Sequence, residues 1–148
     1  MLSGNVIRCR FAYILYMFPD EFYDKLNKSP MTPPKAVFRG AWKILYLLMA
    51  VSFILILFSP NMINKIFAVF LFVVQLILNF NWGCVFFMYK QFKNALYICI
   101  ALLIIVLLMT LVFFKQSFWA GLLQVPYCLW LILATYLNYY VVKENPQL

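Results

Sequence analysis

The chain has 148 residues, of which 67% are hydrophobic, 20% aromatic and only 11% charged. An ordinary soluble domain is about 45–50% apolar, so water could not cover this much apolar surface, and a soluble enzyme or binding domain is excluded. The net charge of +8 raises the possibility of nucleic acid binding, but the basic residues are spread between the apolar runs and form no dense block. We therefore expect membrane lipid, and no nucleic acid, among the partners.

The first predicted element is a short helix at about residues 5–19. Its uncharged part, residues 11–19, is nine residues long, roughly half of what a helix needs to cross the hydrocarbon. Arg8 and Arg10 precede it and could snorkel to one interface. A secretory signal peptide is the alternative interpretation, but Pro19 is followed by acidic residues where a small-residue cleavage site belongs.

A polar loop at residues 20–34 follows and contains Pro30, Pro33 and Pro34. Its composition predicts a defined cap over one end of the bundle rather than a continued helix. Thr32 can cap the next helix, and Pro33 and Pro34 suit its first positions, where no backbone donor is needed.

Four runs without any charged residue make up most of the remaining chain. They cover residues 44–64, 66–89, 94–114 and 116–142, which are 21, 24, 21 and 27 residues long. Each is long enough to cross about 30 Å of hydrocarbon as a helix. We predict helices at about 35–58, 64–89, 93–114 and 117–142, the last bent at Pro126. The predicted fold is a single all-α domain over residues 1–148, an integral membrane bundle of five transmembrane helices whose first helix is short or degenerate.

The charges between the runs predict the topology. With alternating loops, eight basic residues lie on one side and four on the other, so the positive-inside rule places the carboxyl terminus in the cytoplasm. The bias toward Ile, Asn, Lys, Phe and Tyr is typical of an AT-rich genome. It favours a bacterial cell membrane over the mitochondrial outer membrane.

Residues that usually carry catalysis are scarce. The chain has no histidine, and its acids all lie outside the apolar runs: Asp20, Glu21, Asp24 and Glu144. This argues against catalytic triads, metal sites and a proton-coupled exporter, which needs a titratable group within the membrane. The cysteines show no close pairing and are interpreted as small packing residues: Cys9, Cys84, Cys99 and Cys128. We expect no required cofactor and no metal.

Three stripes at helical spacing are candidate functional surfaces. One is polar and aromatic and consists of Gln75, Asn79, Trp82 and Phe86; the others consist of Tyr127, Trp130, Ala134 and Leu137, and of Phe38, Trp42 and Tyr46. Amides in lipid normally turn inward and bond other helices, so the stripes could simply hold the bundle together. They could equally enclose an apolar pocket for a planar ligand.

The end of the last run fits a proposed sterol pattern through Leu137, Tyr139 and Lys143. The pattern is weak, and an aromatic and basic interface anchor explains it as well. Because Tyr139 lies about 180° from Trp130 around the helix, a sterol there would occupy a different face from a ligand at Trp130.

Four ordered blocks give the chain a family resemblance. They are FYDKLNKSPMTPP at residues 22–34, VFRGAWKILYLLM at 37–49, QLILNFNWGCVFF at 75–87 and VPYCLWLILATYLNYYV at 125–141. With them the chain resembles the translocator protein family, also called tryptophan-rich sensory proteins or peripheral-type benzodiazepine receptors.

The resemblance implies a five-helix bundle, usually a homodimer, with a pocket beneath the first loop for porphyrins, haem-related tetrapyrroles and isoquinoline or benzodiazepine drugs. It also implies sterol binding at the end of the last helix. The positions that match the family's pocket are Tyr23, Pro33, Phe38, Ala41, Trp42, Asn79, Trp82, Trp130, Ala134 and Leu137. The implied function is a membrane receptor or carrier that binds tetrapyrroles or sterols without chemistry.

Two alternatives stay open. Trp42 and Trp130 match tryptophans implicated in the light- and oxygen-dependent degradation of porphyrin, so a degrading enzyme is one of them. The other alternative is a degenerate family member with a structural or partner-binding role, and the short, charged first helix favours it.

Overall fold

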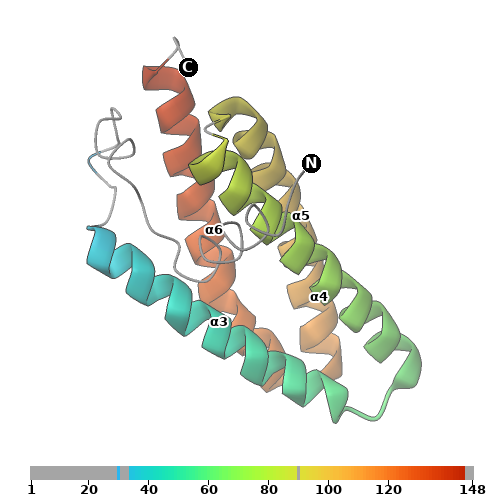
Figure 1. Ribbon diagram of the computed structural model, residues 1–148. Helices are drawn as coiled ribbons and strands as arrows, with labels where there is room; N and C mark the ends of the chain where they lie inside the picture. The colour runs from blue at the N-terminus through green and yellow to red at the C-terminus, as the bar shows by residue number, and fades with distance from the viewer. Residues whose placement is uncertain (1–29, 31–33, 90, 146–148) are drawn as a thin grey trace, which may run out of the picture.

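The computed structural model describes residue 30, residues 34–89 and residues 91–145. The predicted first helix at 5–19 and most of the cap loop at 20–34 lie outside the described residues. The chain forms α3 (Lys35–Leu57), α4 (Met62–Gly83), the π-helical turn η1 (Cys84–Met88), α5 (Phe92–Gln116) and α6 (Phe118–Glu144), as Figure 1 shows. This part of the chain contains no strand.

The four predicted membrane-spanning helices are confirmed. In the described ranges, four helices are long and apolar enough to cross a bilayer: Ala36–Leu57, Met62–Phe86, Phe92–Gln116 and Phe118–Glu144. At 1.5 Å per residue even the shortest of these spans, Ala36–Leu57 with 22 residues, reaches about 33 Å, slightly more than the hydrocarbon thickness. The fold is thus an all-α bundle of a multi-pass membrane protein.

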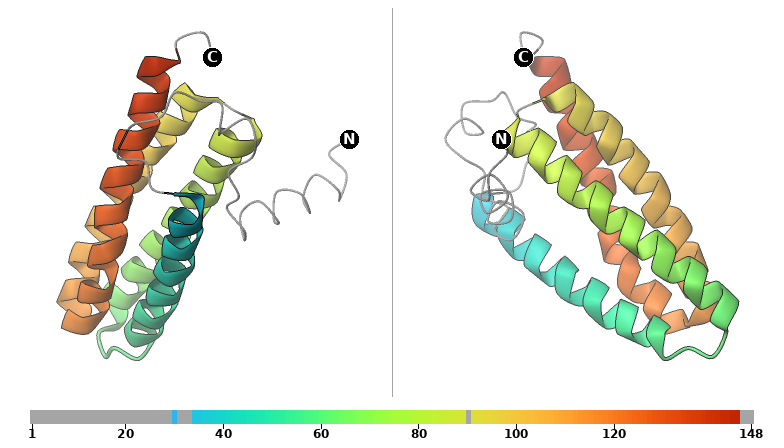
Figure 2. Two further views of the ribbon diagram at one scale, coloured as in Figure 1. Left: turned by 90° about the vertical axis from the view of Figure 1, so that its left-hand side faces the viewer. Right: turned by 45° about the vertical axis from the view of Figure 1, so that its right-hand side comes forward.

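Neighbouring helices in the chain run antiparallel, and their order in space differs from their order in sequence. α5 packs against both α4 and α6, while α3 packs mainly against α6 and little against α4. Figures 1 and 2 show α3 nearest α4 at the short connection between them and farther away toward the start of α3. The start of α3 and the end of α6 therefore lie at the same end of the bundle.

Hydrogen bonds fix the helix starts and the short connections between the helices. Pro34 occupies the N-cap of α3, one position before the first-turn place that the sequence predicted for it, and its carbonyl accepts from the Phe38 N–H at 2.9 Å. At the other end of the bundle, the Asn61 side chain caps α4 by accepting from the Asn64 N–H at 3.1 Å. Gln116 links the two connections there, because its amide donates to Ser59 Oγ at 2.9 Å and to the Asn61 carbonyl at 3.0 Å.

α5 and α6 approach closely because small residues line their contact. Cys99 Sγ lies 3.2 Å from Thr135 Oγ1, and Cys128 Sγ lies 3.2 Å from Thr110 Oγ1. Both thiols are buried and free, as expected of small packing residues. Near the start of α6, Gly121 lies directly against the Phe114 ring of α5.

Gly121→Ala is expected to destabilise the bundle by about 1–3 kcal/mol, because the added methyl would overlap the Phe114 ring and force packed helices apart. Thermal unfolding in detergent, followed by circular dichroism, measures the effect. The matched control is Gly40→Ala: a methyl at Gly40 meets nothing within 4 Å, so helix propensity alone should leave it neutral or stabilised by about 1 kcal/mol. Equal shifts in the two variants would contradict the predicted overlap.

Candidate functional site

Aromatic rings from three helices meet between the middle of the bundle and the end where α3 begins and α4 ends. We call this group the aromatic cluster, and it consists of Phe38, Trp42, Tyr46, Trp82, Tyr127 and Trp130. Trp42 lies at its centre, with ring centroids 5.9 Å from Trp82 and 6.2 Å from Trp130. The Trp42 and Trp130 rings are nearly perpendicular, at 87°, which is a favourable edge-to-face arrangement.

The other rings close the cluster around Trp42. Tyr46 lies 5.7 Å away by ring centroid, Phe38 lies 6.2 Å away and Tyr127 6.4 Å away. Only 1% of the Trp42 surface and 3% of the Trp82 surface remain exposed. The predicted stripes of α3, α4 and α6 therefore face one another.

A chain of hydrogen bonds lies beside the rings and joins the same three helices. Tyr46 donates from its hydroxyl to Asn79 Oδ1 at 3.3 Å, and Asn79 Nδ2 donates to the Tyr127 hydroxyl oxygen at 2.7 Å. That hydroxyl donates in turn to Gln75 Oε1 at 2.9 Å, and Gln75 Nε2 lies 3.7 Å from Met49 Sδ. Gln75 and Asn79 are fully buried, so the amides act as interhelical links in a medium without water.

A second link orients Trp82. Its indole N–H donates to Asn138 Oδ1 at 3.1 Å, and Asn138 Nδ2 donates to the Phe92 carbonyl at 3.0 Å. Asn138 thus fixes the ring plane of Trp82 and ties α4, α5 and α6 together. The π-helical turn η1 begins two residues after Trp82, and its Phe86 ring packs 5.6 Å from the Trp82 ring.

Three side chains hold buried polar atoms that have no hydrogen-bond partner in the described part of the chain. They are Trp42 and Trp130, through their indole N–H groups, and Gln124, through both amide atoms. Unpaired buried polar groups are rare, because each costs free energy that a partner would recover. Two of the three donors belong to the aromatic cluster, so the cluster holds unused hydrogen-bonding capacity next to flat aromatic faces.

Trp130 also forms one wall of a groove on the outside of the bundle, between α3 and α6. We call it the α3/α6 groove. It has a cavity volume of about 460 Å³ and is lined by Ala41, Ile44, Leu45, Leu48, Pro126, Leu129, Trp130 and Leu133. Apart from the indole N–H of Trp130, which is buried, none of these side chains carries a hydrogen-bonding group.

The structure brings together most of the positions that the family resemblance assigned to a pocket. The buried ones are Phe38, Trp42, Asn79, Trp82 and Ala134. Trp130 and Leu137 are half-buried, as is Ala41, which lines the α3/α6 groove rather than the cluster. Tyr23 and Pro33 lie outside the described residues.

The predicted sterol residues do not share one face of α6. Tyr139 is 52% exposed, and Lys143, four residues later, is exposed too, so at 100° per residue the two lie about 40° apart. Leu137 is half-buried and lies about 160° from Tyr139 around the helix. Sterol binding through the three residues stays a prediction.

Three features of the site were not predicted. Asn138 and Gln124 are amides inside an apolar run, and that signal was present in the sequence, because Asn138 follows Ala134 by four residues and Gln124 precedes Tyr127 by three. The α3/α6 groove had no such signal. Its aliphatic residues resemble every other lipid-facing position of the chain.

Comparison with known proteins identifies the family. The sequence profile of the TspO/MBR family matches residues 6–143. The chain is 35% identical over 127 residues to the tryptophan-rich sensory protein of Cereibacter sphaeroides, covering 86% of this chain and 78% of that protein. It is 34% identical to the tryptophan-rich protein TspO of Chlorobaculum tepidum, covering 84% and 80%, and 30% identical to the protein CrtK of Rhodobacter capsulatus, covering 86% and 81%. The chain therefore belongs to the TspO/MBR family of membrane proteins.

Proposed function

We propose that this chain is a membrane receptor or carrier that binds tetrapyrroles, porphyrin and haem among them, in a pocket inside the bundle at the aromatic cluster. The observation that carries the proposal is the meeting of Trp42, Trp82 and Trp130 from three helices, two of them with unpartnered indole N–H groups. Flat aromatic faces stack on a macrocycle, and the free donors can bond its polar edge. Sterols are the second proposed ligand class, at the end of α6.

Binding without chemistry fits the side chains of the cluster. Its polar members are two tyrosines and the indole N–H groups, joined by the amides of Gln75 and Asn79. Such groups orient a ligand, but they include no strong base or nucleophile of the usual kind. No metal or cofactor is needed for this function.

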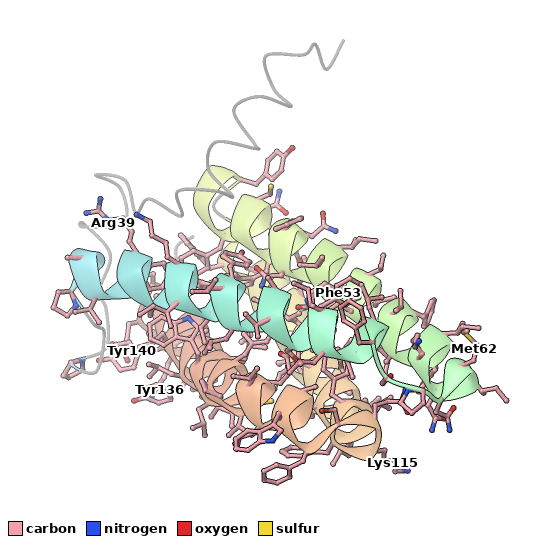
Figure 3. All side chains as sticks on the ribbon, turned by 90° about the horizontal axis from the view of Figure 1, so that it is seen from below. Arg39, Phe53, Met62, Lys115, Tyr136 and Tyr140 are labelled. Carbon is pink, nitrogen blue, oxygen red and sulfur yellow. The ribbon has the colours of Figure 1, made fainter. Side chains whose placement is uncertain are left out.

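The proposed setting is a bacterial cell membrane with the carboxyl terminus in the cytoplasm. Among the described residues, the end of the bundle where α3 begins and α6 ends carries Arg39, Lys43, Lys93 and Lys143, and the other end carries Lys65 and Lys115. Figure 3 shows Arg39 and Lys115 at these opposite ends. This distribution favours the first end as the cytoplasmic one. A homodimer is the proposed assembly, as the family resemblance implies.

Titration with protoporphyrin tests the proposed function. Trp42→Phe combined with Trp130→Phe removes both free donors and reduces the stacking area, so we expect affinity to fall about 10- to 100-fold, equivalent to about 1.4–2.8 kcal/mol. Quenching of tryptophan fluorescence in nanodiscs measures it. The control is Trp119→Phe, because Trp119 is 65% exposed at the opposite end of α6 and should leave affinity unchanged. Unaltered affinity in the double variant would exclude the cluster as the site.

Light-dependent degradation of porphyrin is the second candidate function. It is favoured by the close approach of three oxidisable indole rings. The ring centroids of Trp82 and Trp130 lie 5.9 Å and 6.2 Å from that of Trp42. Illuminating the protein with protoporphyrin in air should then give a product that the double variant does not form. If the porphyrin absorbance bleaches equally fast without protein, binding alone remains.

A further inference from the structure

Trp42, at the centre of the aromatic cluster, is only 1% exposed, so a ligand can stack on its ring only if a neighbouring side chain moves. Two members of the cluster are half-buried, Tyr46 and Trp130. Tyr46 is held in place by the bond from its hydroxyl to Asn79. Trp130 has no such bond to any residue that the structure describes, so it is the member that can be displaced with the smallest loss.

Trp130 separates the aromatic cluster from the α3/α6 groove. One part of the ring packs against Trp42 and Phe38, with centroids 6.2 Å and 5.9 Å away, and the side chain also lines the groove. We propose that the α3/α6 groove is the place where a planar tetrapyrrole docks from the lipid, and that the ligand enters the cluster by displacing Trp130. This inference rests on the proposed function and adds the route and the docking site.

The shape and chemistry of the groove fit a flat ligand that arrives from hydrocarbon. Its lining residues run from Ala41 to Leu48 on α3 and from Pro126 to Leu133 on α6, two helical turns or about 10 Å on each side. Its volume of about 460 Å³ lies within the range of about 300–1,000 Å³ that is typical of small-molecule sites. All eight residues belong to helices that are long and apolar enough to span the membrane, which favours an occupant that arrives from the membrane and tolerates aliphatic walls.

The wall of the groove is weakest on the α6 side. Pro126 has no backbone N–H, so the helical hydrogen bond to the Leu122 carbonyl is missing one turn before Trp130. A helix can give way at such a point with less loss than elsewhere. On the α3 side, the small side chain of Ala41 leaves the groove open beside the Trp130 ring.

Stopped-flow binding of protoporphyrin to the protein in nanodiscs tests the entrance. Leu48→Trp narrows the groove at a half-buried lining residue that is not one of the predicted pocket positions. We expect both the association and the dissociation rate to fall about tenfold, with an unchanged Kd, because an entrance alters passage and not the bound state. The matched control is Leu47→Trp, since Leu47 is a 64% exposed leucine of α3 outside the groove. Leu129→Ala widens the groove and should raise both rates.

Each outcome separates the entrance from the proposed function. Unchanged rates in Leu48→Trp would overturn the entrance and leave the tetrapyrrole pocket standing. Weaker affinity with an unchanged association rate would place Leu48 inside the pocket and also overturn the entrance. Failure of the unmodified protein to bind protoporphyrin would overturn both proposals. Rates that move in opposite directions in Leu48→Trp and Leu129→Ala, with equal affinities, are the expected result.

Discussion

Trp42→Ala is expected to destabilise the bundle by about 3–5 kcal/mol, which is the usual cost of truncating a buried large aromatic side chain. Trp42 is 1% exposed, and its ring contacts those of Phe38, Tyr46, Trp82, Tyr127 and Trp130. Removing it leaves a cavity where three helices meet. The thermal unfolding midpoint in detergent, read by circular dichroism, should fall by more than for any other substitution named here.

The control is Trp119→Ala, at a tryptophan that is 65% exposed. It should change stability by less than about 0.5 kcal/mol, as surface substitutions usually do. Comparable losses in the two variants would mean that Trp42 does not organise the contact between α3, α4 and α6. The large expected loss is also why the ligand titration uses the milder Trp42→Phe, which keeps an aromatic ring in the same place.

The four spanning helices could be predicted because lipid imposes a simple requirement. Every backbone polar group must be satisfied within the segment, so a charge-free run of about 20 residues has to be a helix. Details set by local contacts could not be predicted. The turn η1 is an example. It is defined by an i to i+5 hydrogen bond from the Tyr89 N–H to the Cys84 carbonyl, and its five residues are too few to show a sequence periodicity.

The candidate site was partly predictable for a related reason. Helical periodicity placed Gln75, Asn79 and Trp82 on one inward face, and the structure buries all three. Periodicity gives only the relative direction of side chains on one helix, and the rotation of each helix against its neighbours decides the partners. The sequence therefore could not pair Asn79 with Tyr127 or Trp82 with Asn138.

The stripe predicted on α6 shows the same limit. Tyr127, Trp130 and Leu137 share one side of the helix, yet Tyr127 is buried while the other two are half-buried. The stripe lies across the boundary between the bundle interior and the α3/α6 groove. Whether a residue on that boundary faces protein or lipid depends on the distance between α3 and α6, which no pattern within either helix specifies.

Gln124→Met is expected to stabilise the bundle, by about 1–3 kcal/mol. Gln124 is fully buried, and neither of its amide atoms has a partner in the described ranges. The side chain therefore carries the full desolvation penalty of an amide without the compensating bonds. Methionine is similar in length and shape and flexible enough to fill the same space, so the substitution removes the penalty and keeps the packing.

Gln75→Met is the matched control, because Gln75 is equally buried but accepts a hydrogen bond from the Tyr127 hydroxyl at 2.9 Å. There the same change leaves the hydroxyl without its acceptor, and we expect a loss of about 1–3 kcal/mol. The two glutamines thus predict shifts of opposite sign in the thermal midpoint for one and the same chemical change. A loss at both positions would show that Gln124 is bonded in the folded protein, for example to water or to a residue outside the described ranges. Opposite signs would show that hydrogen bonding, and not the amide itself, decides whether a polar side chain stabilises the interior of this bundle.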